Sequence, residues 1–194
     1  MDKFQVLTSN VIPLFVNNID TDQIIPARYL KVTDKKGLGA NLFADWRYKS
    51  DGSPNPDFIL NKSGYQKARI LLTGDNFGSG SSREHAPWAL MGWGINVVIS
   101  TSFADIFRNN ALKNGLLPIV VSEEIQESLF DLSEEAPAAT VGIDLEAQHL
   151  TLPNGDKVSF EIDTFSKTCM LEGIDQLGYL LKHEDQIAAF EEGR

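Results

Sequence analysis

The stretch most suited to chemistry is a loop rich in glycine and serine that also carries an arginine and a histidine. It reads Gly-Ser-Gly-Ser-Ser-Arg-Glu-His over residues 78–85. Glycines let the backbone approach a ligand closely, and the free N–H groups at the start of a helix attract anions. Arg83 adds a guanidinium that can hold a carboxylate through two hydrogen bonds. The loop therefore predicts a site for an anionic ligand.

Within this loop, Ser81 is the better candidate for chemistry, because Ser82 can be used to cap the following helix. An unassisted serine is a weak base, so a basic role needs neighbours that stabilise its alkoxide. A cation at the positive end of a helix is unfavourable, and an anion bound at Arg83 would relieve that cost. Two plainer alternatives stay open. The loop can be a structural turn, and His85 is more typical of a packed, hydrogen-bonded residue than of a proton carrier.

Spacing excludes other uses of such residues. Arg83 stands where the dinucleotide-binding fingerprint needs a third glycine or alanine, no Gly-Lys-Ser/Thr follows, and no serine has glycine at both −2 and +2. Cys169 alone cannot hold an iron–sulfur cluster, which takes three or four thiolates, and is expected to be buried. His149 and His183 lack a nearby metal-ligand pattern. We therefore expect no metal and no cofactor on this chain.

A second polar turn, Asp20-Thr21-Asp22, precedes a short apolar segment that begins at Ile24. No glutamate follows at the spacing of a calcium-binding loop. Side chains of this kind cap helices. Capping and catalysis are about equally favoured for this turn.

The composition is that of a globular chain long enough for one sizeable domain, with 194 residues of which 42% are hydrophobic. The sequence contains no run of 18 or more apolar residues, so no membrane span is expected. Residues 1–5 lack the features of a signal peptide. A single cysteine favours a reducing cytoplasm. The net charge of −10 argues against nucleic-acid or membrane partners, so an anionic substrate needs a local basic pocket.

The elements that position the loop alternate between strand and helix patterns. Strands are expected at 10–16, 68–73, 95–100 and 116–121, and helices at 84–93, 102–114 and 123–132. This alternation predicts an α/β fold with parallel pairing. Pro13 suggests an edge or a bulge in the first strand. Ser102 is expected to cap a helix whose apolar face holds Phe103, Ile106 and Phe107.

The pattern changes after residue 137. Short strands are expected at 141–145, 149–152 and 157–162, and Asn154-Gly155 predicts a hairpin turn between the last two. The chain from residue 163 to residue 194 is expected to form a helical, acidic tail. Residues 31–38, where charge and glycine dominate, predict a mobile loop.

Four linked motifs resemble the swivel domain of the aconitase family. They lie in the family's order and spacing at residues 18–26, 78–86, 102–110 and 115–118. Two further stretches, 41–47 and 85–90, are similar to the small subunits of bacterial 3-isopropylmalate dehydratases. The resemblance spans almost the whole chain.

The resemblance implies a fold, namely a single swivelling β/β/α domain over residues 1–194 with a mixed sheet, flanking helices, a short β-hairpin region and a helical C-terminus. It also implies an activity. The family interconverts 2- and 3-isopropylmalate by dehydration and rehydration in leucine biosynthesis. Its [4Fe–4S] cluster lies on a separate large subunit, so the expected partners are that subunit and a small dicarboxylate hydroxy acid.

Residue roles follow from the same resemblance. Ser81 matches the family's serine base, which takes the proton alpha to a carboxylate. Arg83 matches an arginine that binds a substrate carboxylate and helps to stabilise the serine alkoxide. Asp22 matches an aspartate that pairs with a histidine from the cluster-bearing part.

Substrate binding is assigned to Gly80 and Ser82 of the loop and to Arg28 and Leu30 of the 27–31 segment. In relatives this segment resembles a specificity loop, and an apolar contact such as Leu30 suits an isopropyl group. Aconitase places a further substrate arginine near here, for a third carboxylate. The alternatives are a homoaconitase-type or methylcitrate-type small subunit, or a non-catalytic anion-binding module.

Overall fold

The computed structural model describes residues 2–30 and 35–192. Part of the predicted loop at 31–38 therefore lies outside the described residues. Within it, Lys35 and Lys36 are exposed, but Leu38 is only 2% exposed and begins a short 3₁₀ helix. The prediction extended the loop too far, because one apolar side chain in a charged stretch is enough to attach it to the core.

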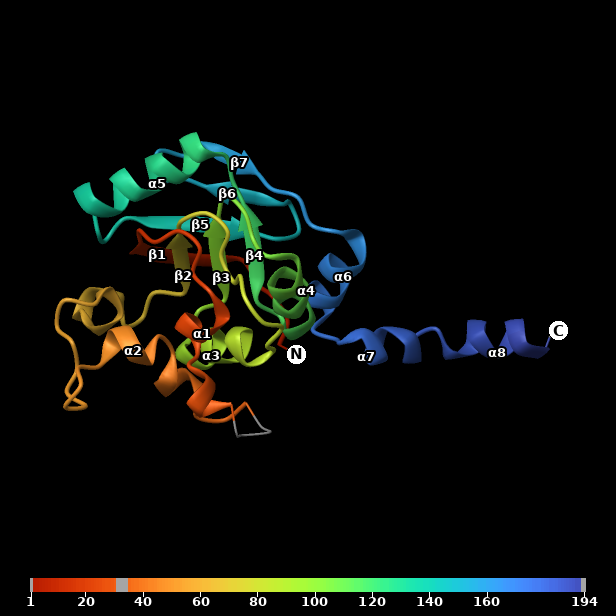
Figure 1. Cartoon of the computed structure of the whole chain (residues 1–194). Helices are drawn as coiled ribbons and strands as arrows, with labels where there is room; N and C mark the ends of the chain where they lie inside the picture. The colour runs from red at the N-terminus through yellow and green to blue at the C-terminus, as the bar shows by residue number, and fades with distance from the viewer. Residues whose placement is uncertain (1, 31–34, 193–194) are drawn as a thin grey trace.

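A seven-stranded mixed sheet forms the centre of the molecule, with the strand order β4-β3-β2-β1-β5-β6-β7 (Figure 1). The strands β1 to β4 pair in parallel, and β5 to β7 continue from β1 in antiparallel pairing. Their bounds are β1 (Leu7–Leu14), β2 (Ile70–Thr73), β3 (Val97–Ser100), β4 (Leu117–Val120), β5 (Thr140–Asp144), β6 (His149–Thr151) and β7 (Lys157–Ser159). The predicted α/β fold class, with parallel strands followed by a hairpin region, is confirmed.

Strand β1 joins the two halves of the sheet. Its residues 7–10 pair with β5, and its residues 11–14 pair with β2. Pro13 lies in the second half, beyond the pairing with β5. Proline cannot donate to a ladder, so it is tolerated where one flank of a strand has no partner strand. Pro13 thus marks a local edge inside a central strand.

Helices cover both faces of the sheet (Figure 1). Their bounds are α1 (Thr21–Ile24), α2 (Ala44–Arg47), α3 (His85–Trp93), α4 (Asp105–Asn114), α5 (Glu123–Glu135), α6 (Thr164–Glu172), α7 (Gln176–Leu181) and α8 (Glu184–Glu192), with 3₁₀ turns η1 (Ala27–Tyr29), η2 (Leu38–Asn41), η3 (Ile59–Asn61) and η4 (Ser63–Tyr65). None of the helices in the described residues is long and apolar enough to cross a membrane.

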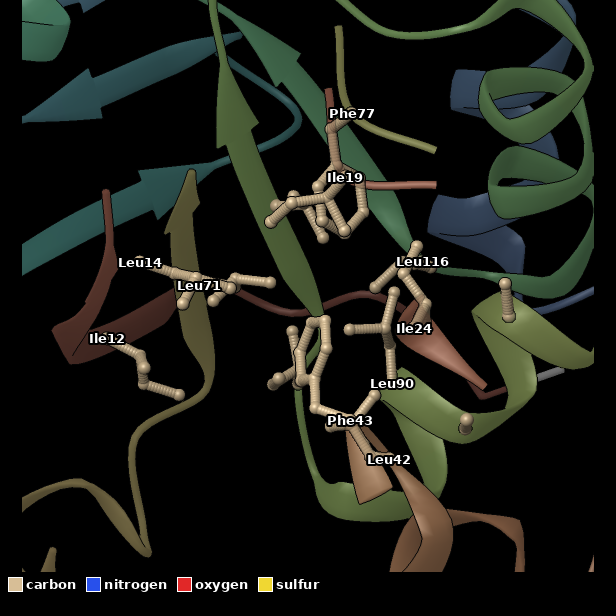
Figure 2. Packing of buried hydrophobic residues seen from close by; sticks show 14 of the residues in the cluster. Ile12, Leu14, Ile19, Ile24, Leu42, Phe43, Leu71, Phe77, Leu90 and Leu116 are labelled. Carbon is tan, nitrogen blue, oxygen red and sulfur yellow. The ribbon is translucent and has the colours of Figure 1, made fainter. Parts of the chain in front are cut away.

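Buried side chains alternate along the strands and fill two cores, one on each face. On β2, Leu71 belongs to the first core, whereas Ile70 and Leu72 belong to the second. The first core is closed by α1 to α4 and the second by α5, α6 and the hairpin strands. Figure 2 shows the first core, in which Phe43 of the α2 segment and Leu90 of α3 converge. This core holds α1 and α3 together, and with them the two predicted functional turns.

The predicted cap of α4 is wrong. Helix α4 begins at Asp105, its capping position is Ala104, and no side chain caps it. The hydroxyl of Ser102 instead donates a hydrogen bond to the carboxylate of Asp75. Ile106 is 51% exposed and does not belong to the apolar face, whereas Phe107 is buried as predicted.

The chain ends as its pattern predicts. Gly155 has a left-handed φ of 91° in the turn between β6 and β7. The tail from residue 163 is helical, with α6 against the body and α7 and α8 extending away from it (Figure 1).

Candidate functional site

The candidate site forms around residues 74–84, the loop that joins β2 to α3. The loop leaves the carboxyl end of a central parallel strand, where ligands bind in sheets of this kind. Gly78 and Gly80 have left-handed φ values of 80° and 91°. A Cβ at Gly78 would overlap the ring of Phe107. Glycine at position 78 is therefore required both by the backbone and by the close approach of α4.

Hydrogen bonds join this loop to the turn that carries Asp22. The backbone N–H of Gly78 donates to Ile19 O over 2.7 Å, and that of Thr21 donates to Ser79 O over 2.9 Å. The hydroxyl of Thr21 donates to Ser81 O, also over 2.9 Å. The two turns are separated by about sixty residues in sequence but are held together as one unit.

Asp20 caps α1 in a reciprocal arrangement. Its carboxylate accepts from the N–H of Gln23, and the side chain of Gln23 accepts from the N–H of Asp20, both over 2.8 Å. This is a capping box, and the capping prediction for the turn is confirmed at Asp20. Asp22 is thus left for another role.

Asp22 and Arg83 form an ion pair across the two turns. The side chain of Arg83 is 17% exposed and that of Asp22 is 53% exposed. The hydrogen bond from Arg83 lowers the pKa of Asp22, and the guanidinium charge and the backbone N–H of Ala27 act in the same direction. The sequence predicts a ligand anion at the cationic start of α3, whereas the structure places the carboxylate of Asp22 there.

An open depression of about 770 Å³ lies beside this pair. Its lining contains three loop residues to which the sequence analysis assigns catalysis or substrate binding. Leu30 from the 27–30 segment and two side chains from α4 complete this part of the lining. The full lining is Leu30, Ser81, Ser82, Arg83, Glu84, His85, Trp88, Asn110 and Lys113. Gly80 does not line the depression. Its left-handed φ helps to set the shape of the loop.

Ser81 and Ser82 are both exposed in the loop. The prediction that Ser82 caps the following helix is wrong, because Glu84 holds the capping position of α3 and no side-chain cap is formed there. Both hydroxyls are therefore placed at the surface of the depression.

Two lining residues, Asn110 and Lys113, were missed by the sequence analysis. They lie three residues apart on α4, so they share one face of that helix. Their spacing was visible in sequence, but nothing in the sequence placed this face beside Ser81. Lys113 adds a second positive charge to the depression.

A hydrogen-bonded group centred on Asn114 joins α3 to α4 beside the depression. Its side-chain oxygen accepts from Trp88 Nε1 over 2.7 Å and from Lys35 Nζ over 2.9 Å. Its side-chain nitrogen donates to Asn110 O over 2.9 Å. His85 packs against Trp88 with ring centroids 4.9 Å apart, which agrees with its predicted packing role.

Arg28 lies elsewhere. It pairs with Asp45 in a separate depression of about 550 Å³, and this pairing raises the pKa of the guanidinium. The structure thus brings Leu30, but not Arg28, to the depression that contains Ser81. The assignment of Arg28 to substrate binding stays a prediction.

Among the described residues, no group of three or more His, Cys, Asp and Glu side chains is arranged to hold a metal ion. Cys169 is buried on α6, and burial raises the pKa of its thiol. Its predicted burial is confirmed.

Comparison with known proteins adds family relationships to this geometry. Residues 1–124 match the family model of the aconitase C-terminal domain, and residues 127–164 match a family model described as LeuD_N. The 3-isopropylmalate dehydratase small subunit of Roseiflexus sp. is 58% identical over 194 residues, covering 100% of this chain and 95% of the relative. That of Anaeromyxobacter dehalogenans is 57% identical over 194 residues, with 100% of each chain covered.

A solved structure agrees with these relatives. The crystal structure of 3-isopropylmalate dehydratase (leuD) from Methanocaldococcus jannaschii has a TM-score of 0.68 and 27% identity to this chain. The match covers 95% of this chain and 99% of that one. Family models, full-length relatives and fold thus agree, and the chain belongs to the family of 3-isopropylmalate dehydratase small subunits.

Proposed function

We propose that this chain is the small subunit of a 3-isopropylmalate dehydratase, a hydro-lyase that interconverts 2- and 3-isopropylmalate through 2-isopropylmaleate in leucine biosynthesis. The full-length relatives support this function. The observation that carries it at the site is the meeting of Ser81, Arg83 and Leu30 around one depression. These side chains provide a hydroxyl, a carboxylate-binding cation and an apolar contact.

Ser81 acts as the base in this proposal. As an alkoxide it takes the proton alpha to a substrate carboxylate, while the hydroxyl on the neighbouring carbon leaves. Arg83 and Lys113 bring two positive charges to the lining of the depression and Glu84 brings one negative charge, and a cation next to Ser81 would favour the charged form of its hydroxyl. A preorganised cation beside the reacting group stabilises developing charge without reorganisation.

Arg83 binds a substrate carboxylate in this proposal. A guanidinium has five N–H donors, and Asp22 engages one of its terminal nitrogens. Asp22 therefore orients the guanidinium and leaves donors for a ligand. Because Asp22 is itself half exposed, it is also accessible to a partner's histidine, the role that the family resemblance implies.

The group that activates the leaving hydroxyl comes from outside this chain in this proposal. A [4Fe–4S] cluster on the large subunit would polarise the leaving hydroxyl. The isopropyl group would contact Leu30, and such an apolar contact contributes about 1–3 kcal/mol to discrimination.

We also propose that the whole chain is one swivel domain of the aconitase type. A cytoplasmic location is proposed because the sole cysteine, Cys169, forms no disulfide.

The test is reconstitution with the cluster-loaded large subunit. The isolated chain should be inactive, and the assembled enzyme should hydrate 2-isopropylmaleate. Ser81→Ala should lower kcat by at least about 10²–10⁴-fold, the usual contribution of a positioned base. The matched control is Ser79→Ala, in the same loop but outside the lining, which should keep wild-type turnover. Turnover by the isolated chain, or full activity of Ser81→Ala, would overturn the proposal.

A further inference from the structure

The C-terminal arm, residues 175–192, is held firmly at its root although it extends away from the body (Figure 1). Asp175 caps α7 by accepting from the N–H of Gly178 over 2.8 Å. Tyr179 packs edge-on against Phe165 of α6 with centroids 4.9 Å apart, and Lys182 pairs with Glu172. The two contacts with α6 fix the direction in which the arm leaves the molecule.

One face of the arm is apolar and exposed. Leu177, Leu180 and Leu181 are 63%, 54% and 59% exposed, and their i, i+3, i+4 spacing puts them on one face of α7. Ile187, which is 42% exposed, lies on the next helix, α8. Tyr179, which contacts α6, lies on the other side of α7. Contiguous exposed apolar side chains of this kind mark interaction surfaces.

The charge of the arm distinguishes between possible occupants. Residues 175–192 contain five acidic side chains and one lysine, and the whole chain has a net charge of −10. A second copy of this chain would bring like charges together, which is unfavourable at an interface. A partner with basic residues around an apolar groove is complementary to the arm.

The arm also begins next to the candidate site. Lys113 lines the depression that contains Ser81, and it lines a second depression of about 140 Å³ together with Phe165 and Gln176. Gln176 is the first residue of α7. The root of the arm and the site therefore border the same helix, α4. A subunit that covers Ser81 would continue directly onto the arm.

We propose that the arm is a docking element for the large subunit. The stripe of Leu177, Leu180, Leu181 and Ile187 binds in an apolar groove with a basic rim on that subunit, in the manner of an amphipathic helix in a groove. This inference rests on the proposed function, which supplies the partner.

The test compares two double variants in titrations with the purified, cluster-loaded large subunit. Leu177→Ser/Leu181→Ser removes half of the stripe. The matched control, Val6→Ser/Val120→Ser, removes two exposed apolar side chains outside the arm. We expect the arm variant to raise the Kd at least about tenfold, as expected for central apolar contacts, while kcat at saturating large subunit stays at the wild-type value. The control should keep the wild-type Kd.

An unchanged Kd for the arm variant, with an active wild-type enzyme, would overturn this inference and leave the proposed function standing. Failure of the wild-type chain to form an active complex would overturn both. Light scattering on the isolated chain tests the alternative occupant, a second copy of this chain. If the arm substitutions change self-association and leave the Kd for the large subunit unchanged, the arm binds a second copy, and the proposal is wrong.

Discussion

Arg83 lies directly before the first turn of α3, where the helix dipole opposes a positive charge. In this chain the carboxylate of Asp22 lies opposite the guanidinium and compensates this unfavourable interaction. Backbone hydrogen bonds and one from the Thr21 hydroxyl hold the two turns together, so the geometry of the pair does not depend on its two side chains alone. Arg83 is thereby kept at the edge of the depression that Ser81 also lines.

The first prediction concerns the stability of this pair. The folded pKa of Asp22 lies below its ordinary value of 3.8, so the pair stabilises the folded chain fully above that pH. The contribution is lost as pH falls through the lowered pKa. Since the pair is partly exposed, Asp22→Asn should cost at most about 1 kcal/mol at neutral pH. The difference from wild type, measured by urea unfolding, should shrink below pH 3.8.

A control at Asp131→Asn, on the exposed surface of α5, corrects for the loss of one carboxylate elsewhere. A difference at Asp22 that is constant from neutral to strongly acidic pH would show that the ion pair does not stabilise the fold.

The site could be predicted from sequence only where its chemistry is local. Ser81 and Arg83 stand two residues apart in a loop of unusual composition, so their types and spacing indicated an anion site. The pairing of Arg83 with Asp22 depends on two turns meeting in space, and spacing carries no such information. Lys113 was not predicted for the same reason, because only the packing of α4 brings it to the site.

At the scale of elements, β2 and β3 were predicted well because their apolar runs are buried on both faces, whereas β1 was predicted at 10–16 and lies at Leu7–Leu14. Residues 70–73 and 97–100 are buried throughout. Errors arose where one polar side chain had two possible partners. Ser102 resembles a helix cap, but the carboxylate of Asp75 accepts its hydrogen bond after the strands have assembled. Local propensity cannot detect a competing acceptor that only tertiary structure supplies.

The second prediction tests the close approach of α4 to the loop at residues 74–84. Gly78 and Gly52 have nearly the same φ, 80° and 81°, but a Cβ at Gly52 would meet nothing within 4 Å. Gly52→Ala should therefore cost only the left-handed conformation, about 1–2 kcal/mol. Gly78→Ala also overlaps Phe107, which should add about 1–3 kcal/mol. The free energies of unfolding in urea measure both.

Equal losses for the two variants would mean that the ring of Phe107 moves aside without cost. A larger loss at Gly78 would confirm that the loop is held by packing as well as by its backbone.

At the scale of the whole molecule, the two faces of the sheet have different surroundings. The first face carries α1, α3 and the candidate site, and the second is covered by α5 and the hairpin strands (Figure 1). A partner that completes the site must cover the loop at 78–85 and has no reason to reach α5. The shape of the molecule thus predicts which face is buried on assembly.

Hydrogen exchange, followed with and without the large subunit, measures this third prediction. Amides of residues 78–85 should exchange more slowly in the complex, because binding both excludes water and suppresses local opening of the loop. Amides of α5 provide the internal control and should exchange at the same rate in both samples. Protection of α5 without protection of the loop would place the partner on the opposite face and would contradict the proposed function. Protection of the loop without protection of α5 would instead place the partner over the depression that contains Ser81.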